Sequence, residues 1–521
     1  MTSKYILRIC AALLALSAGL STFALAQQKA EHEVQLGVVN FPISCNEKAQ
    51  EEFHTGLAHL HHMMYEQARP HFEEAAKVDP SCAMSHWGIA MTSFQPLWHP
   101  TSPEGLERGQ AALARARELG APTEREKGYI AAVEAFFTDP ESRRESPARD
   151  HEARVRAWLE AQRELHESYP EDVDAAAFYA LAEVCYAMTQ FSPHEERDFT
   201  RERRAGALIE EYFEDHPEHP GLFHYLLHAY DSSELAHKAL EAARGYDKLA
   251  PNTPHALHMP SHIFVRLGLW EETVDRDKRA AKAARDGMED DPHASAHYVH
   301  SLDYVMYAYL QLGDTENARK TLERARTLDK VHPVPFAAYN LAALQVRHFL
   351  EQQQWQQAAE LEPAMPDVLP WEQFPAAEAI FYYGRGIGAA RSGDLNQAKM
   401  DRERLQERIH TLRDEDDAYW ASMTEALGKA VEAWILYEQG ETEQALSLMR
   451  EGADLEDSMD KHPTTPGEVL PVRELYADLL LKEERFEQAK AAFEASLQRT
   501  PNRRNALRGL EMAELRENTT R

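Results

Sequence analysis

The feature that most constrains the fold is a helical pattern that recurs along the chain. Ala, Leu, Tyr and Phe return at helical spacing in most segments, and alternating apolar and polar runs are nearly absent after the first 44 residues. The last complete unit, "LYADLLLKEERFEQAKAAFEASLQRTP", repeats an order of aromatic and small residues that already appears in residues 56–80. The pattern predicts an all-α chain of repeated helix pairs.

This order of residues resembles the tetratricopeptide repeat (TPR). The first unit carries Gly56, Tyr65, Ala68, Phe72, Ala75 and Pro80, and the last carries Tyr476, Ala477, Phe486, Ala489, Phe493, Ser496 and Pro501. The resemblance covers most of residues 45–515. It implies a TPR-like α-solenoid of helix hairpins wound into a right-handed superhelix, in which small residues allow close helix contacts and aromatic residues fill the neighbouring space.

Breaks in the pattern divide the chain into six regions. Polar stretches such as "TDPESRRESPARDHEA" interrupt the repeats in the middle, and Pro-rich loops separate the later units. We expect a signal peptide (1–26), an N-terminal tail (27–44), N-terminal TPR-like helices (45–140), a divergent helical insert (141–215), central His-rich TPR units (216–345), and C-terminal TPR units with a capping helix (346–521).

The first 26 residues have the organisation of an export signal. A short cationic start is followed by the apolar run "ICAALLALSAGLSTF" and by "ALA", a small-residue cleavage site. We predict cleavage after Ala26 and a periplasmic or secreted product. No later stretch approaches the roughly 20 apolar residues that a membrane span needs, so no membrane insertion is expected after cleavage.

A strongly acidic composition excludes one class of partner. The formal net charge is −31, and it becomes −33 when Lys4 and Arg8 leave with the signal. Such a chain repels phosphate backbones and shows no basic stripe, so we expect no nucleic-acid partner.

Three cysteines remain after cleavage: Cys45, Cys82 and Cys185. An exported protein reaches an oxidising compartment where a disulfide can form, and Cys45 with Cys82 is the candidate pair. The alternative for each of the three is a free buried thiol.

Histidines are concentrated in "HPGLFHYLLHAYD", residues 219–231, and "PHALHMPSHIFVRLG", residues 254–268. His258 follows His224 by 34 residues, and His262 follows His228 by the same number, which is the length of one TPR unit. In TPR proteins the first helix of each hairpin lines the concave groove. From that resemblance we expect the following residues to face the groove: His224, His228, Asp231, His255, His258, His262, His297, His300 and Asp303.

Imidazoles three or four residues apart lie on one helical face and can share a metal ion. The nine inward residues are therefore candidate ligands for a divalent transition metal, zinc or copper. The alternative is that these histidines pack as half-polar core residues or donate to a bound peptide. Pro260 complicates the metal hypothesis, because it should break or kink a helix that contains both His258 and His262.

Sequence motifs of common enzymes are missing. There is no "HExxH" helix, "GxSxG" elbow, "GxxxxGK" loop or "GxGxxG" turn. We therefore expect a binding or scaffold protein with a protein or peptide in its concave groove. The alternative is a metal-dependent, hydrolase-like enzyme in which the same histidines activate water, with Asp231 or Asp303 as the base.

A narrower resemblance concerns the segments HPGLxHYLLHAYD and HALHMPSHIF. These are similar to segments of a family of exported bacterial TPR proteins, for which no activity is implied. The segments "FPISC" and "DPSCAM" also resemble that family, and this favours the pairing of Cys45 with Cys82.

Overall fold

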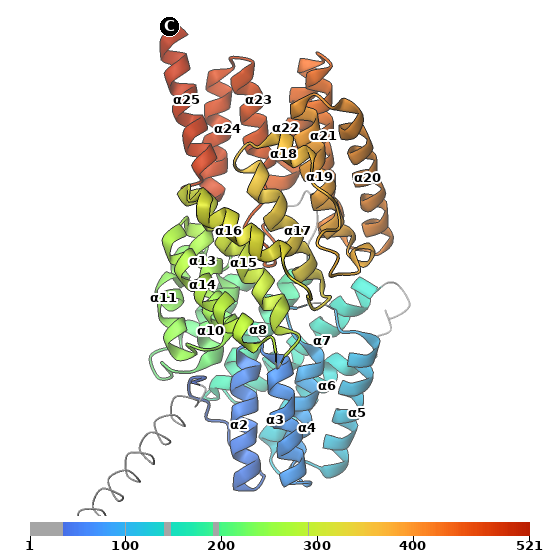
Figure 1. The fold of residues 1–521 in the computed structure, drawn as a ribbon. Coiled ribbons are helices and arrows are strands. Elements are labelled where there is room, and N and C mark those ends of the chain that lie inside the picture. Colours follow the sequence, from blue (N-terminus) through green and yellow to red (C-terminus); the bar gives the residue numbers. More distant parts are fainter. Residues whose placement is uncertain (1–34, 99, 140–146, 191–196, 290, 521) are drawn as a thin grey trace, which may run out of the picture.

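A computed structural model describes residues 35–98, 100–139, 147–190, 197–289 and 291–520. Every regular element in these ranges is a helix, and none is a strand. The helices form hairpins that follow one another along the long axis of the molecule, from α2–α7 at one end to α20–α25 at the other (Figure 1). The expectation of an all-α, TPR-like solenoid is confirmed. The predicted signal peptide lies outside the described residues.

The N-terminal hairpins are held by helix caps and by close contacts at small residues. Asn46 caps α2 through a hydrogen bond from the Ala49 backbone N–H, and Thr123 and Glu126 form a capping box at the start of α6. A Cβ on Gly88 would lie 2.3 Å from the ring of Phe72, so this helix contact requires glycine. The helices are α2 (Glu47–His61), α3 (Tyr65–Val78), α4 (Ala83–Phe94), α5 (Pro103–Leu119), α6 (Glu124–Phe137), α7 (Pro147–Ser168), α8 (Val173–Thr189) and α9 (Thr200–Glu210).

A disulfide joins Cys45 to Cys82, with an S–S distance of 2.03 Å. It connects the residue before the Asn46 cap to the residue before α4, across the α2–α3 hairpin. Cys185 is a free thiol buried on α8.

The central hairpins carry the histidine-rich segments. Their helices are α10 (Pro220–Ala229), η2 (Ala236–Ala239), α11 (Leu240–Leu249), α12 (Pro254–His258), α13 (Pro260–Leu267), α14 (Trp270–Gly287), α15 (Ala294–Leu312), α16 (Thr315–Arg326) and α17 (Pro335–Leu350).

Pro260 divides the helix that the TPR spacing predicts. α12 ends at His258 and α13 begins at Pro260, but the intervening Met259 keeps right-handed helical dihedrals, φ −51° and ψ −38°. Proline fits here because it occupies the first position of α13, where a backbone N–H is not needed. The chain therefore passes the proline with little change of direction, and His258 and His262 still face the same side.

The C-terminal hairpins continue the stack and end in α25, which covers α24. A Cβ on Gly509 would lie 2.2 Å from the Phe493 ring, which shows how closely this last helix packs. The helices are α18 (Trp355–Ala359), η3 (Trp371–Gln373), α19 (Pro375–Ser392), α20 (Leu395–Asp414), α21 (Ala418–Glu438), α22 (Thr442–Asp457), α23 (Val472–Lys482), α24 (Phe486–Arg499) and α25 (Arg504–Thr520).

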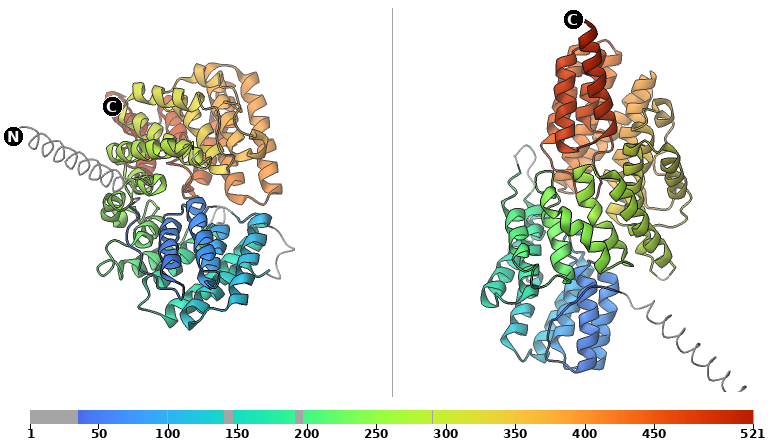
Figure 2. Two further views of the ribbon diagram at one scale, coloured as in Figure 1. Left: turned by 60° about the horizontal axis from the view of Figure 1, so that its bottom comes forward. Right: turned by 90° about the vertical axis from the view of Figure 1, so that its left-hand side faces the viewer.

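Two large hydrophobic cores form along the solenoid. One contains buried side chains from Phe41 to Phe264, and the other contains buried side chains from Ala281 to Ala513. The helices that supply the first core lie toward one end of the molecule, and those that supply the second lie toward the other end (Figure 2). α10, α12, α13 and α15, which carry the predicted ligands, lie where the two cores meet.

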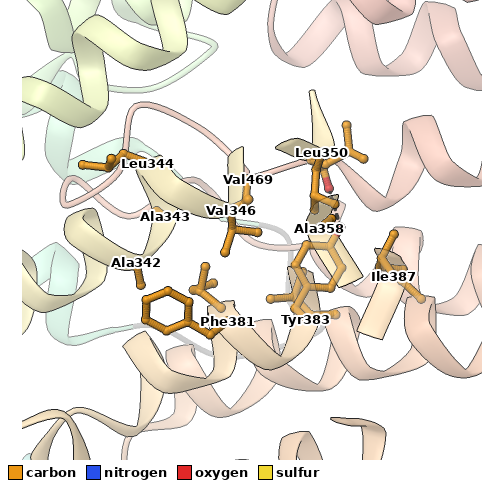
Figure 3. Packing of buried hydrophobic residues seen from close by; sticks show 14 of the residues in the cluster. Ala342, Ala343, Leu344, Val346, Leu350, Ala358, Phe381, Tyr383, Ile387 and Val469 are labelled. Atoms are coloured by element: carbon orange, nitrogen blue, oxygen red, sulfur yellow. Dashed lines mark hydrogen bonds between the residues drawn. The ribbon is translucent and has the colours of Figure 1, made fainter. Parts of the chain in front are cut away.

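The α22–α23 segment, residues 458–471, crosses the first helices of four successive hairpins. Its backbone carbonyls accept hydrogen bonds from Arg266 on α13, Tyr304 on α15, Arg347 on α17 and Tyr383 on α19. Val469 of this segment belongs to the same buried cluster as the α17 and α19 side chains drawn in Figure 3. The chain's own residues thus occupy the inner face of α13–α19, where the sequence led us to expect a partner.

Candidate metal centre

Seven imidazoles from α10, α12, α13 and α15 form one continuous row. Ring centroids are 4.8 Å apart for His224 and His228, 6.2 Å for His228 and His262, and 4.3 Å for His258 and His300. All seven rings are buried except that of His228, which is half-buried. The remaining members are His255 and His297, whose ring centroids lie 5.7 Å apart.

The inner triad consists of His258, His262 and His300. One ring nitrogen of each residue lies within 4.8 Å of the others, and the Nε2 atoms of His258 and His262 are 2.9 Å apart. The i and i+4 spacing across Pro260 places these two rings on one face. The triad is buried on all sides.

Carboxylates fix the opposite edges of two of these rings. His258 Nδ1 lies 2.6 Å from Asp277 of α14, and His262 Nδ1 lies 2.8 Å from Asp231. A carboxylate on Nδ1 orients an imidazole and leaves Nε2 for a metal, which is the usual second layer of metal-bound histidines.

Without an ion, the same contacts form a relay of hydrogen bonds. Burial raises the pKa of Asp277 well above its usual range, which favours a protonated carboxyl that donates to His258 Nδ1. His258 Nε2 then donates to His262 Nε2, and His262 Nδ1 donates to ionised Asp231. His258 and His262 could hold a cation through these Nε2 atoms, and the ion would then take the place of the proton that they share.

The outer triad consists of His224, His228 and His255, and its ring nitrogens also lie within 4.8 Å of one another. The Nε2 atoms of His224 and His228 are 3.1 Å apart, and His224 Nδ1 lies 2.6 Å from the backbone carbonyl of His61. That carbonyl can only accept, so the proton of His224 is on Nδ1 and its Nε2 carries a lone pair.

Burial keeps both triads neutral. It lowers the pKa of His228, His258 and His262 to about 3, and it lowers the pKa of the remaining triad members well below the usual value: His224, His255 and His300. Metal binding requires the neutral imidazole, so near pH 7 none of these rings has to lose an imidazolium proton first. The proton that an ion would have to displace in the inner triad is the one that His258 Nε2 shares with His262 Nε2.

Asp231 is close to the imidazoles but is not a member of either triad. It accepts hydrogen bonds from His262, Arg266 and Lys461. Burial opposes its ionisation, but Lys461 and Arg266 together hold its pKa well below the usual range. These contacts make Asp231 an orienting group for His262, and they do not suit it to be a base.

Asp303 and His297 are also placed outside the triads. Asp303 pairs with Arg347 at 3.2 Å, and burial raises its pKa to about 6 although Arg347 opposes the shift. The ring of His297 packs against Trp98 at a centroid distance of 5.3 Å. Six of the nine predicted ligands therefore form the two triads. The other three, Asp231, His297 and Asp303, lie nearby and contact other side chains.

Sequence reasoning missed Asp277, which orients His258 of the inner triad. Asp277 lies on the second helix of its hairpin, outside the positions that face the groove, so the repeat gave no signal for it. It also missed a third group, in which Asp174 accepts from His61 at 2.8 Å and from His219 at 3.2 Å. In this group each histidine carries its proton on Nε2 and donates it to Asp174. The reason is that His61 Nδ1 accepts from the Tyr225 hydroxyl and His219 Nδ1 accepts from a backbone N–H.

A cavity of about 580 Å³ reaches the outer triad from the side of α8 and α9. His228 and Asp231 form part of its wall, and Lys461 and His462 of the α22–α23 segment form another part. The three residues of the inner triad do not line this cavity.

Comparison with protein families identifies TPR sequences in two places. The family model described as tetratricopeptide repeat matches residues 307–332, from α15 into α16, and residues 471–503, which contain α23 and α24. The chain therefore contains tetratricopeptide repeats, and such a solenoid fits a binding or scaffold role. A comparison with curated protein sequences gives no match. Among the described residues, no helix has the length and apolar character to cross a membrane.

Solved structures similar to this chain are TPR proteins with little sequence identity to it. The P58(IPK) TPR domain is 12% identical, with 91% of this chain and 99% of that chain covered and a TM-score of 0.21. Cut9–Hcn1 of the APC/C is 12% identical, with coverages of 90% and 96% and a TM-score of 0.28. Yeast Tom70 is 11% identical, with coverages of 91% and 90% and a TM-score of 0.27.

Proposed function

We propose that this protein is an exported TPR solenoid that binds a divalent transition metal ion at the inner triad and serves as a binding or scaffold protein. The observation that carries the proposal is the 2.9 Å separation of the His258 and His262 Nε2 atoms, with His300 in the same group. Two nitrogens that share an ion at about 2.0–2.1 Å lie about 2.9 Å apart at a right angle and about 3.3 Å apart at the tetrahedral angle, so the pair is close to coordination distance.

The ligand set indicates which ions would bind. Three neutral imidazoles suit zinc and copper better than calcium or magnesium, which prefer oxygen ligands. Asp231 and Asp277 support the choice, because each lies on the Nδ1 side of a ligand. The ionised Asp231 would balance part of the charge of a dication, and Asp277 would do so once its proton had passed to His258 Nδ1.

A protein or peptide partner in the concave groove belongs to the same proposal. Along α13–α19 the α22–α23 segment already fills that face through contacts with backbone carbonyls. A partner that uses this part of the groove must displace the segment. A periplasmic or secreted location and the narrower resemblance to exported bacterial TPR proteins remain predictions.

Elemental analysis tests the metal site directly. The protein is produced without a polyhistidine tag, purified without chelator, and compared with H258A/H262A. We expect close to one zinc or copper ion per chain at this triad and its loss in the variant. H237A/H410A is the matched control, because it also removes two imidazoles, both exposed on the surface.

Folding of the variant is checked by far-UV circular dichroism. A second measurement needs no variant: Cu(II) added to the parent should give an electron paramagnetic resonance spectrum with splitting from imidazole nitrogens. A parent that holds no zinc or copper, and takes up neither when it is supplied, would overturn the proposal.

A further inference from the structure

The outer triad has the features of a second metal site that differs from the inner one. We propose that His224, His228 and His255 bind a separate divalent zinc or copper ion, one that exchanges with solvent through the 580 Å³ cavity. This inference extends the proposed function to a second ion of the same class. It is supported by contacts of its own.

The first support is an unpartnered nitrogen. His255 Nε2 is buried and accepts or donates no hydrogen bond among the described residues. The ring is only 8% exposed, so water does not replace the missing partner at the surface. A buried polar atom without a partner destabilises the fold, and an ion bound to this imidazole would remove that cost.

The second support is the orientation of His224. Its Nδ1 proton is committed to the carbonyl of His61, so its Nε2 lone pair faces the Nε2 atom of His228, 3.1 Å away. This separation matches two ligands of one ion. A backbone carbonyl fixes the tautomer here, whereas carboxylates do so in the inner triad.

The cavity distinguishes the two sites. Half-buried His228 lies in its wall, and the inner triad is closed. Three protein ligands leave a fourth coordination position open, as in zinc sites that bind water or substrate. We expect that position to face the cavity and to take water or a small anion.

Nearby charges predict weaker binding at the outer triad. Lys461 and Arg266 repel a second dication, and Asp231 offsets part of that repulsion because it pairs with both. Among the residues that the structure describes, no carboxylate is hydrogen-bonded to the outer imidazoles. Second-layer carboxylates are worth about 10–100-fold in metal affinity. The outer ion should therefore be bound more weakly, on the order of tenfold or more, and released first.

The experiment uses the full mature chain, stripped of metal and then loaded with Zn(II). Bound zinc is counted after gel filtration, and its removal by EDTA is followed in time with a colorimetric indicator. We expect two ions in the parent, one fast and one slow to leave. H228A/H255A should keep only the slow ion, and H258A/H262A should keep only the fast one.

Each result separates this inference from the proposed function. One slow ion in the parent that survives H228A/H255A would overturn the second site and leave the inner site standing. One ion that is lost in both variants would indicate a single shared site and would also overturn the inference. No bound ion would overturn both. The two phases in the parent give an answer even if a variant fails to fold.

Discussion

Arg347 gives the sharpest test of how the α22–α23 segment is held. Its guanidinium is fully buried and donates to the carbonyls of Glu468 at 2.6 Å and Gly467 at 3.0 Å, while its Nε pairs with Asp303 at 3.2 Å. The substitution R347M keeps most of the aliphatic volume and removes every one of these hydrogen bonds.

The expected effect is large because the lost contacts are buried and charge-assisted. Hydrogen bonds to charged groups contribute about 1.5–3 kcal/mol each, so losing the two carbonyl contacts should weaken the segment's attachment by about 3 kcal/mol or more. About 3 kcal/mol corresponds to an increase of roughly 150-fold in the population with the segment detached.

Limited trypsin digestion measures that population. Lys461 lies in the segment and is only 6% exposed, so the bond after it should resist cleavage in the parent. In R347M we expect cleavage after Lys461 to accelerate on the order of 100-fold, because cleavage of a transiently open state follows its population. Mass spectrometry identifies the fragment that ends at Lys461.

R319M is the matched control, since Arg319 forms only exposed ion pairs on α16, which are worth little. If the rate of cleavage after Lys461 rises by less than about fivefold in R347M, with the protein still folded, Arg347 does not hold the segment. A comparable rise in the cleavage rate of R319M would show that the effect is not specific to Arg347.

Two further predictions concern stability. Burial lowers the pKa of His228, His258 and His262 from 6.5 to about 3, so the unfolded chain binds more protons between these values and stability is lost as the pH falls through 6.5. Between pH 7.5 and 5.5 the metal-free protein should lose about 4 kcal/mol, seen as a lower urea midpoint; an unchanged midpoint would contradict the neutral, buried rings. C45S/C82S removes a cross-link between residues 37 apart and should cost about 3–4 kcal/mol. Dithiothreitol should lower the midpoint of the parent but not of this variant, and equal responses would refute the assignment.

Much of the fold could be predicted from the sequence, because TPR packing depends on local spacing. Contacts between neighbouring helices, such as Gly88 with Phe72 and Gly509 with Phe493, follow the order of small and aromatic residues in the repeat. Four of the six triad histidines could be found for the same reason, because a 34-residue offset places His258 and His262 on the helix face equivalent to that of His224 and His228. His255 and His300 followed from the groove-facing positions of the repeat.

Features that depend on distant parts of the chain could not be predicted. Asp303 has the position of a ligand on α15, but its partner Arg347 is 44 residues away and turns it into half of a buried ion pair. The sequence of the α22–α23 segment predicts a Pro-rich loop, and no feature of its own residues indicates that it crosses four hairpins. Asp277 gave no signal because its role depends on how α14 lies behind α12.

Asp231 shows why the metal centre and the α22–α23 segment must be considered together. The carboxylate orients His262 at 2.8 Å, and it also pairs with Lys461 of the segment at 3.3 Å. Arg266 bridges the same two parts, since it donates to Asp231 and to Asp460. Each positive side chain lowers the pKa of Asp231, and an ionised Asp231 keeps the proton of His262 on Nδ1. The Nε2 lone pair of His262, on which the inner site depends, is thus set by Arg266 on the same helix and by Lys461, about 200 positions further along the chain, in the α22–α23 segment that lies on the inner face of the solenoid.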